Sequence, residues 1–468
     1  MSEPFHFLGI GGAGMSAIAE LLAAAGHQVS GSDQAEGPMI SHLRRLGITA
    51  HVGHDADHVA ALPESATVVV STAVRETNPE LVAARARGLA VIHRSAALAR
   101  AAADRDFVAV AGAHGKTSTS AMLAVALEAA GQQPSYAIGG TVMGRGTGAH
   151  LGQGRAFVAE ADESDGSFLN YRPRIAVVTN IEPDHLDHYG SEEAFRRSFE
   201  EFTALIEPGG LLVACADDAG AAALARHAAA AGTRVITYGG TVGLAEAPGI
   251  EAHVMLGGDG TLTLRRPAVS DAVATLHLQV PGRHMLLNAT AAWTAGVELG
   301  VEPQAMAAAL GVFTGTGRRF ESRGTVAGIR VVDDYAHHPT EIEATLITAR
   351  EQAGRGRVVA LFQPHLYSRT QAFAERFAQA LSAADVVVVT DVYAAREDPI
   401  PGVDGALITS EIEGARYVAD RHAAARTVAD EAEPGDLLLT IGAGDVTELV
   451  PEILDRLRGR EEAQAGSA

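Results

Sequence analysis

Lysine is nearly absent from this chain of 468 residues, because every basic residue except Lys116 is arginine. Cysteine is equally scarce, since Cys215 is the only one. A single cysteine excludes an internal disulfide and a cysteine-based metal site, and it suits a reducing compartment. No apolar run approaches the roughly 18–20 residues of a transmembrane helix, and the N-terminus lacks the basic and apolar segments of a signal peptide. We therefore expect a cytoplasmic protein without membrane insertion.

Basic charge is also in deficit. The chain has 36 basic and 57 acidic residues, which gives a formal net charge of −21. Binding to nucleic acid or to an anionic membrane requires clustered basic charge, so this balance argues against both partners. The length allows about three domains of roughly 150 residues each, and the hydrophobic content of 47% is ample for their cores. We expect the polar tail after about Arg456 to fray.

The single lysine stands in a glycine-rich segment that follows the apolar stretch Phe107–Ala111. This segment reads Gly112-Ala113-His114-Gly115-Lys116-Thr117-Ser118. Such a loop offers backbone N–H groups and an ammonium to nucleotide phosphates, and a threonine hydroxyl to Mg²⁺. A compact ammonium fits between phosphate oxygens where a broad guanidinium does not, which favours functional retention of Lys116 over chance. The loop departs from the standard G-x-x-x-x-G-K-[ST] pattern, because Val110 stands where the first glycine belongs.

A second glycine-rich segment follows the predicted strand Phe5–Leu8. It reads Gly9-Ile10-Gly11-Gly12-Ala13-Gly14 and precedes a predicted helix that runs to about Ala25 and a strand that leads to Ser32-Asp33. This order is typical of βαβ units that bind a diphosphate at a helix N-terminus. The residues alone leave three readings open: NAD or FAD with Asp33 on a ribose hydroxyl, a sugar nucleotide such as UDP, or a structural turn.

Acidic and imidazole side chains follow two further predicted strands. Glu160 ends the stretch Phe157–Glu160, and His185 follows the stretch Ile175–Asn180. Side chains at the carboxyl ends of parallel strands, beside a phosphate loop, lie where Mg²⁺ ligands are needed. For either residue alone, a solvated loop position is the competing interpretation.

Strands also alternate with helical stretches in the last third of the chain, where the apolar runs Val358–Phe362, Val386–Thr390 and Leu437–Ile441 each precede polar residues. Such alternation is typical of a doubly wound α/β fold. We therefore predict an α/β chain of three domains. They are a Rossmann-like N-terminal domain (residues 1–105), a central P-loop ATPase domain (106–320) and a Rossmann-like C-terminal domain (321–468).

Further motifs extend over essentially the whole chain. They are Glu160–Asp165, Asn180–His185, Pro281–His284 with Asn288, Gly317–Phe320, Asp333–Thr340, Phe362–Thr370 and Tyr393–Ile400. Together with the two glycine-rich loops, these motifs resemble the Mur ligase family. The stretches Asp333–Glu341 and Phe362–His365 resemble its alanine-adding branch and a related branch that recycles murein.

The resemblance implies an ATP-dependent, ADP-forming ligase that joins L-alanine to the lactyl carboxylate of UDP-N-acetylmuramate through an acyl phosphate. It implies ATP and Mg²⁺, a role in peptidoglycan synthesis, and UDP rather than NAD at the first glycine loop. We expect a monomer or weak homodimer. The alternatives are a recycling ligase that adds a whole tripeptide and, less favoured, a non-enzymatic UDP-sugar sensor. A plain NAD oxidoreductase would leave the Lys116 loop unexplained.

The resemblance also implies roles for individual residues. In the ATP site, Lys116 would hold the β- and γ-phosphates, Thr117 and Glu160 one Mg²⁺ and His185 a second. Around the rest of the nucleotide would lie His284 and Asn288 near adenine, Asp334 on ribose, and Arg319 or Arg318 on the γ-phosphate. The UDP-sugar would contact Gly11, Gly12, Ala13, Gly14, Met15, Ser16, Asp33, Ser71 and, at the muramate, His114. The alanine pocket would comprise Tyr335, His337 and Arg369, with Arg369 on the carboxylate and His337 orienting or deprotonating the amine.

The chain departs from the family pattern at two points. Leu366 occupies a position that is arginine in some relatives, so carboxylate recognition would depend more heavily on Arg369. Later-step relatives use a carbamylated lysine near the second metal, and Lys116 is not free for that role. A bridging group would then come from Asp or Glu, such as Glu200, or from water.

Overall fold

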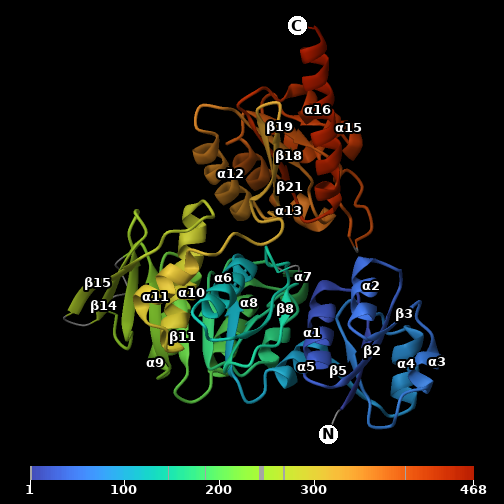
Figure 1. Ribbon diagram of the computed structural model, residues 1–468, viewed down its shortest axis with the longest axis vertical. Coiled ribbons are helices and arrows are strands. Elements are labelled where there is room, and N and C mark those ends of the chain that lie inside the picture. Colours follow the sequence, from blue (N-terminus) through green and yellow to red (C-terminus); the bar gives the residue numbers. More distant parts are fainter. Residues whose placement is uncertain are drawn as a thin grey trace. The chain divides into compact units, whose positions relative to one another are not determined.

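The computed structural model describes residues 3–145, 147–184, 186–241, 247–266, 269–395 and 397–467. The chain divides into two compact units. The first comprises residues 1–279 and 285–314, and the second comprises 280–284 and 315–468. Unit 1 contains two sheets and unit 2 contains one. Each sheet is rich in parallel strands covered by helices, which confirms the predicted three-domain α/β fold (Figure 1).

The first sheet of unit 1 has five parallel strands in the order β3-β2-β1-β4-β5. The strands are β1 (Pro4–Leu8), β2 (Gln28–Asp33), β3 (Thr49–Val52), β4 (Thr67–Val70) and β5 (Ala90–His93). The helices are α1 (Ala13–Ala24), α2 (Pro38–Arg45), α3 (Ala56–Ala60), α4 (Pro79–Ala86) and α5 (Arg94–Ala101). The strand order reverses between β1 and β4, and a crevice at such a reversal is where open α/β sheets bind ligands. The first glycine loop leaves β1 at this point.

The second sheet of unit 1 has ten strands in the order β15-β14-β13-β12-β11-β10-β6-β9-β7-β8. The strands are β6 (Asp106–Ala111), β7 (Ser135–Ala137), β8 (Ala149–His150), β9 (Ala156–Glu160), β10 (Ile175–Val178), β11 (Leu211–Cys215), β12 (Arg234–Gly239), β13 (Ala252–Leu256), β14 (Thr261–Arg266) and β15 (Val269–Thr275). The helices are α6 (Lys116–Ala129), α7 (Leu186–Tyr189), α8 (Glu192–Ala204), α9 (Ala219–Ala230), α10 (Arg283–Glu298), which begins in unit 2, and α11 (Pro303–Leu310). Strands β6, β9 and β10 lie side by side, so the predicted phosphate loop and the residues that follow β9 and β10 share one edge.

The sheet of unit 2 has the order β16-β17-β21-β18-β19-β20. The strands are β16 (Glu321–Val326), β17 (Ile329–Asp334), β18 (Val358–Phe362), β19 (Val386–Val389), β20 (Arg416–Tyr417) and β21 (Leu437–Ile441). The helices are α12 (Pro339–Ala353), α13 (Tyr367–Leu381), α14 (Ala406–Thr409), α15 (Arg421–Glu431) and α16 (Val450–Ser467).

Strand β18 shows why the apolar runs of unit 2 have no polar alternation. Val358, Ala360 and Phe362 pack in the core on the side of α12 and α13, whereas Val359 and Leu361 pack on the side of α15 and α16. Because successive side chains point to opposite faces, a strand covered by helices on both faces must be apolar throughout.

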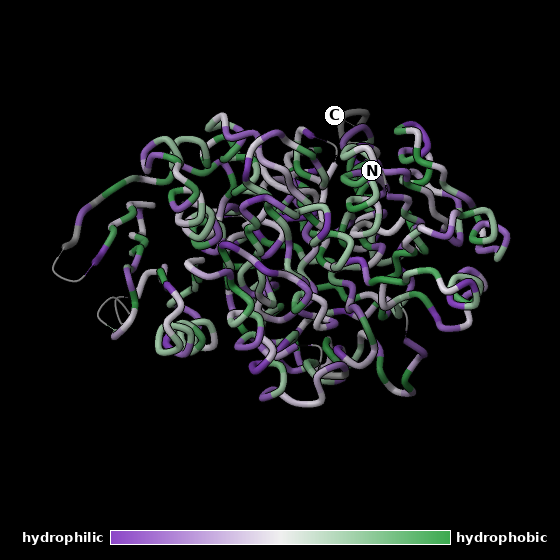
Figure 2. Tube along the Cα trace, turned by 90° about the horizontal axis from the view of Figure 1, so that it is seen from below, coloured by the Kyte–Doolittle hydropathy of each residue, from purple (hydrophilic) through white to green (hydrophobic). Residues whose placement is uncertain are grey.

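One expectation was wrong at the C-terminus. The tail does not fray after Arg456, because α16 continues to Ser467. Leu457 is fully buried, and Arg456 pairs with Asp430 of α15 at 2.7 Å. Among the described residues, no helix is long and apolar enough to cross a membrane. Hydrophobic and hydrophilic stretches alternate along the trace (Figure 2).

Candidate functional site

The first glycine loop is held by hydrogen bonds to the end of β2. The N–H groups of Gly9 and Ile10 donate to the Ser32 carbonyl at 2.8 and 2.9 Å. The N–H of Gly11 donates to the Asp33 carboxylate at 2.8 Å. A Cβ on Gly11 would lie 3.0 Å from the same carboxylate, which explains the glycine. Asp33 therefore stabilises the conformation of the glycine loop by this hydrogen bond. A contact with ribose is not needed to explain an aspartate at this position.

A buried carboxylate supports this loop from behind. Glu80 in the first turn of α4 is 0% exposed, and both of its oxygens accept hydrogen bonds. Oε2 accepts from His6 Nε2 at 3.0 Å and from Ser32 Oγ at 2.8 Å. Oε1 accepts from His58 Nδ1 at 2.8 Å and from the Asp55 N–H at 3.0 Å. Burial opposes ionisation, yet the hydrogen bonds from His6, His58 and Ser32 lower the pKa of Glu80 to about 2. Sequence analysis did not single out Glu80.

This lowered pKa makes the first domain acid-sensitive. The ordinary pKa of the Glu80 carboxyl is 4.5, so protonation in the unfolded chain removes its contribution to folding as the pH falls from about 4.5 towards 2. At pH 7 we expect Glu80→Gln to lower local stability by roughly 3 kcal/mol, measured by native-state hydrogen exchange of the β1 and β4 amides. The deficit relative to the parent protein should shrink below about pH 4. An equal deficit at pH 7 and pH 3 would contradict this account.

Two glycines of the phosphate loop admit no side chain. Gly112 has a φ of 131°, and a Cβ there would lie 2.2 Å from Thr179 Oγ1. Gly115 has a φ of 84° and immediately precedes α6, and a Cβ there would lie 2.7 Å from Asn288 Oδ1. Asn288 thus lies against the phosphate loop, and its predicted place near adenine stays a prediction.

Lys116 is the first residue of α6, and its ammonium is hydrogen-bonded to the phosphate loop and to the acidic run that follows β9. Nζ donates to the Gly112 carbonyl at 2.6 Å and to Glu163 Oε1 at 2.8 Å. Burial opposes the charge, but the neighbouring carboxylates Glu163 and Asp162 raise the pKa of Lys116. Burial raises the pKa of Glu163 to about 7, against the attraction of Lys116. Sequence analysis gave Glu163 no role, although it lies in the acidic run that follows Glu160.

The predicted Mg²⁺ ligands Thr117 and Glu160 come together. Thr117 Oγ1 donates to Glu160 Oε2 at 3.1 Å, and the Gly139 N–H donates to Oε1 at 2.7 Å. The Oε2 atom of Glu163 is buried and has no hydrogen-bond partner. Hydroxyl and carboxylate oxygens are the ligands that Mg²⁺ prefers, so these residues fit the ion. The third predicted ligand, His185, lies outside the described residues, and the bridging role of Glu200 on α8 stays a prediction.

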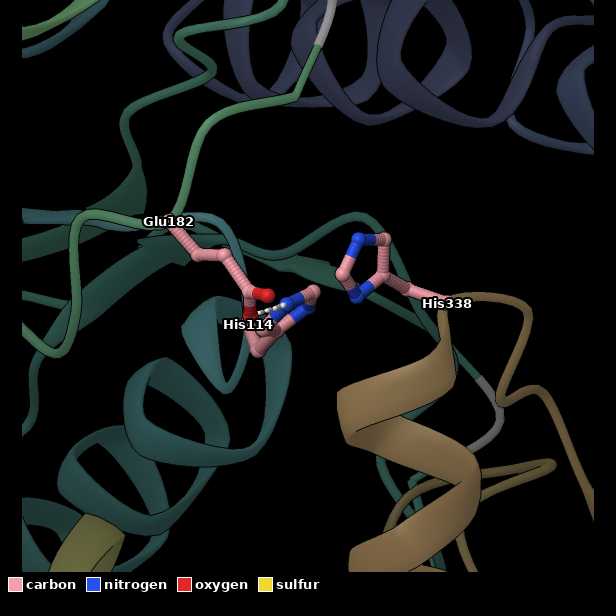
Figure 3. A group of neighbouring side chains, drawn as sticks. All are labelled: His114, Glu182 and His338. Carbon is pink, nitrogen blue, oxygen red and sulfur yellow. Dashed lines mark hydrogen bonds and ion pairs between the residues drawn. The ribbon is translucent and has the colours of Figure 1, made fainter. Parts of the chain in front are cut away.

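His114 is tied to the end of β10. Its N–H donates to Asn180 Oδ1 at 2.9 Å, and its carbonyl accepts from Thr179 Oγ1 at 2.6 Å. Its ring nitrogen Nε2 lies 3.2 Å from Glu182 Oε2 (Figure 3). Ser118 is buried, as are Met15 and Ser16 beside the first glycine loop, and their predicted contacts with ligands stay predictions.

In unit 2, several predicted site residues lie at the end of β17 or directly after it. Asp334 is buried, and its two oxygens accept hydrogen bonds from the Phe320 and Ala336 N–H groups at 2.7 and 2.8 Å. Burial raises the pKa of Asp334 to about 6. The Tyr335 ring lies 4.8 Å from the Arg318 guanidinium and 5.2 Å from that of Arg319. The carboxylate of Asp334 thus fixes the turn that presents this tyrosine and the two arginines.

The two arginines differ in their partners. The guanidinium of Arg318 donates to the Gly442 carbonyl and lies 3.5 Å from Asp333, inside unit 2. Arg319 lies 3.7 Å from Glu341 on α12. Both arginines are therefore engaged within unit 2, and a contact of either with the γ-phosphate stays a prediction.

The imidazole of His337 is kept neutral. Nδ1 contacts the Tyr335 carbonyl at 3.0 Å and Glu341 at 3.2 Å. Burial lowers the pKa of His337 to about 3 and that of His284 to about 4. A general base works best with a pKa near the working pH, so His337 is better suited to orient an amine than to deprotonate it. Arg369, in the first turn of α13, is 7% exposed, and Leu366 before that helix has a φ of 70°.

Sequence models of one family match three consecutive parts of the chain. They are described as Mur ligase family, catalytic domain (residues 4–106), Mur ligase middle domain (110–296), and Mur ligase, glutamate ligase domain (318–444). The chain belongs to the Mur ligase family. The predicted resemblance is thereby confirmed.

Individual members of the Mur ligase family resemble the chain over nearly its full length. A UDP-N-acetylmuramate–L-alanine ligase of Kineococcus radiotolerans is 56% identical, covering 97% of this chain and 96% of the relative. A protein of the same name from Mycolicibacterium paratuberculosis is 50% identical, covering 100% and 98%.

Two solved structures share the fold. The UDP-N-acetylmuramate–alanine ligase of Thermotoga maritima has a TM-score of 0.76 at 28% identity, covering 98% of this chain and 99% of that one. A murein peptide ligase of Psychrobacter arcticus has a TM-score of 0.70 at 25% identity, with the same coverage.

Proposed function

We propose that this protein is an ATP-dependent ligase that joins L-alanine to the lactyl carboxylate of UDP-N-acetylmuramate, in the cytoplasm. The observation that carries the proposal is the intact phosphate site: the Lys116 ammonium and the Thr117–Glu160 pair lie at one sheet edge. Curated relatives of this name, 50–56% identical, support the choice of substrates.

The reaction must first make the carboxylate reactive, because oxide is a poor leaving group. A lactyl oxygen attacks the γ-phosphorus of ATP, the bond to the β,γ-bridging oxygen breaks, and an acyl phosphate and ADP form. Lys116 and Arg319 would stabilise the charge on the transferring phosphoryl group. Mg²⁺, held by Thr117 and Glu160, would neutralise further phosphate charge.

The second step forms the amide. The neutral alanine amine attacks the acyl carbon and forms the C–N bond, phosphate leaves with the electron pair of the C–O bond, and the nitrogen gives its surplus proton to the departing phosphate. Arg369 would bind the alanine carboxylate, and His337 would accept a hydrogen bond from the amine and orient it. The neutral imidazole of His337 suits a positioning role, since a cationic imidazolium would repel the alanine ammonium as it binds.

The proposal is tested by phosphate release from ATP in the presence of Mg²⁺. We expect release only when UDP-N-acetylmuramate and L-alanine are both present, and none when either is omitted. Faster release with an L-alanyl tripeptide than with L-alanine would indicate the recycling reaction instead. Binding of UDP-N-acetylmuramate without turnover on any amino acid or peptide would leave only a sugar-nucleotide sensor.

A further inference from the structure

Arg94 lies between the end of the first glycine-rich loop and the acidic segment that follows β9 in unit 1. It is the first residue of α5, and its guanidinium Nη2 donates to Asp162 Oδ2 at 2.7 Å. On its other side, a Cβ on Gly14 would lie only 2.9 Å from Arg94 Nη1. The glycine at position 14 therefore makes room for this guanidinium. About a quarter of the Arg94 side chain (24%) remains exposed.

Asp162 connects Arg94 to the phosphate loop. It lies in the run Glu160–Asp165 at the end of β9, which we call the acidic segment. Burial opposes its ionisation, but the charges of Lys116 and Arg94 and the hydrogen bond from the Ser164 N–H (3.1 Å) lower the pKa of Asp162. Arg94 is thus paired with Asp162 at 2.7 Å, and the next residue, Glu163, is paired with Lys116 at 2.8 Å.

Residues on both sides of Arg94 bind the same segment. The His93 ring lies 3.6 Å from Asp165, and Asn170 Nδ2 donates to Ser95 Oγ at 2.7 Å. Three consecutive residues at the start of α5 are therefore fixed to residues 162–170. A displacement of the acidic segment would be passed directly to Arg94.

We propose that Arg94 is a positioning residue that couples the two loops, so that ATP at the Lys116 loop and UDP-sugar at the first glycine loop strengthen each other's binding. This inference rests on the proposed function. Nucleotide phosphates draw the Lys116 ammonium away from the acidic segment. Asp162 then interacts more strongly with Arg94, which holds the guanidinium against Gly14 and stabilises the loop in its binding conformation.

The test is a binding cycle that needs no turnover. Calorimetry measures the Kd of UDP-N-acetylmuramate with and without Mg²⁺ and a non-hydrolysable ATP analogue. For the parent protein we expect the analogue to tighten binding about fivefold or more. In Arg94→Ala the ratio of the two Kd values should fall to within about twofold of one, and Arg94→Lys should restore part of it. Because coupling is reciprocal, the sugar nucleotide should tighten analogue binding by the same factor.

The matched control is Arg100→Ala in the same helix. Its guanidinium pairs with Glu3 at 2.8 Å, away from the acidic segment, so the coupling should be retained. Asp162→Asn should abolish coupling, and the double variant Arg94→Ala/Asp162→Asn should lose no more than either single variant. The inference is overturned if the parent shows no coupling, or if Arg94→Ala keeps it while binding both ligands. Failure of the parent to bind UDP-N-acetylmuramate at all would instead refute the proposed function.

Discussion

Lys116→Arg is expected to lower kcat of the proposed ligase reaction by about 10³-fold or more, although the substitution keeps the positive charge. Nζ lies 2.6 Å from the Gly112 carbonyl and 2.8 Å from Glu163 Oε1, and only 17% of the side chain is exposed. A guanidinium is broader than an ammonium and cannot occupy the same space without displacing the loop. Steady-state phosphate release measures the loss, and calorimetry should show that the Kd of UDP-N-acetylmuramate changes less than about threefold, since that ligand binds the other loop.

The matched control exchanges the same two residue types elsewhere. Arg174 is 54% exposed and pairs with Asp106 at 3.2 Å, so Arg174→Lys should keep full activity. If Lys116→Arg were as active as the parent protein, charge alone would suffice at this position and the steric argument would be wrong.

The local parts of the site could be predicted from sequence because each depends on neighbours along the chain. Lys116 and Thr117 come from one loop, and Glu160 ends a strand that pairs with the strand before that loop. The partners of these residues could not be predicted in the same way. Glu163 is 47 residues from Lys116, and Asp162 is 68 residues from Arg94. Only the folded chain brings such pairs together.

In the fold, too, some elements could be predicted from the sequence and others could not. Apolar runs such as β18 and β21 identify strands covered on both faces, and both were predicted with the observed bounds. The antiparallel strands β13–β15 were not anticipated, although Thr261–Leu264 alternates threonine with leucine, a pattern typical of a strand with one buried face. The turn Gly257–Gly260 before β14 was a usable signal for a hairpin. The predicted domain boundaries at 105/106 and 320/321 stay predictions.

The absence of a second lysine bears on the metal site. Some relatives in the family use a carbamylated lysine near the second metal. This chain cannot do so, because its only lysine is Lys116. The bridging group near the second metal would then come from Asp, Glu or water. Glu163 is well placed to contribute, because its buried Oε2 has no hydrogen-bond partner and its Oε1 would lose Lys116 to the nucleotide phosphates.

Glu160→Gln should lower kcat by about 10²- to 10³-fold and raise the Mg²⁺ concentration for half-maximal activity at least tenfold. An amide is a neutral and weaker Mg²⁺ ligand, and its NH₂ group competes for the space beside Thr117. The loss should also appear without turnover, as a smaller enhancement by Mg²⁺ of the binding of a non-hydrolysable ATP analogue. Glu128→Gln is the matched control, because Glu128 is 41% exposed on α6 and pairs only with Arg145 among the ion pairs of the described residues. Parent-like Mg²⁺ dependence in Glu160→Gln would show that the ion is held elsewhere, and the acidic segment around Glu163 would then be the place to search.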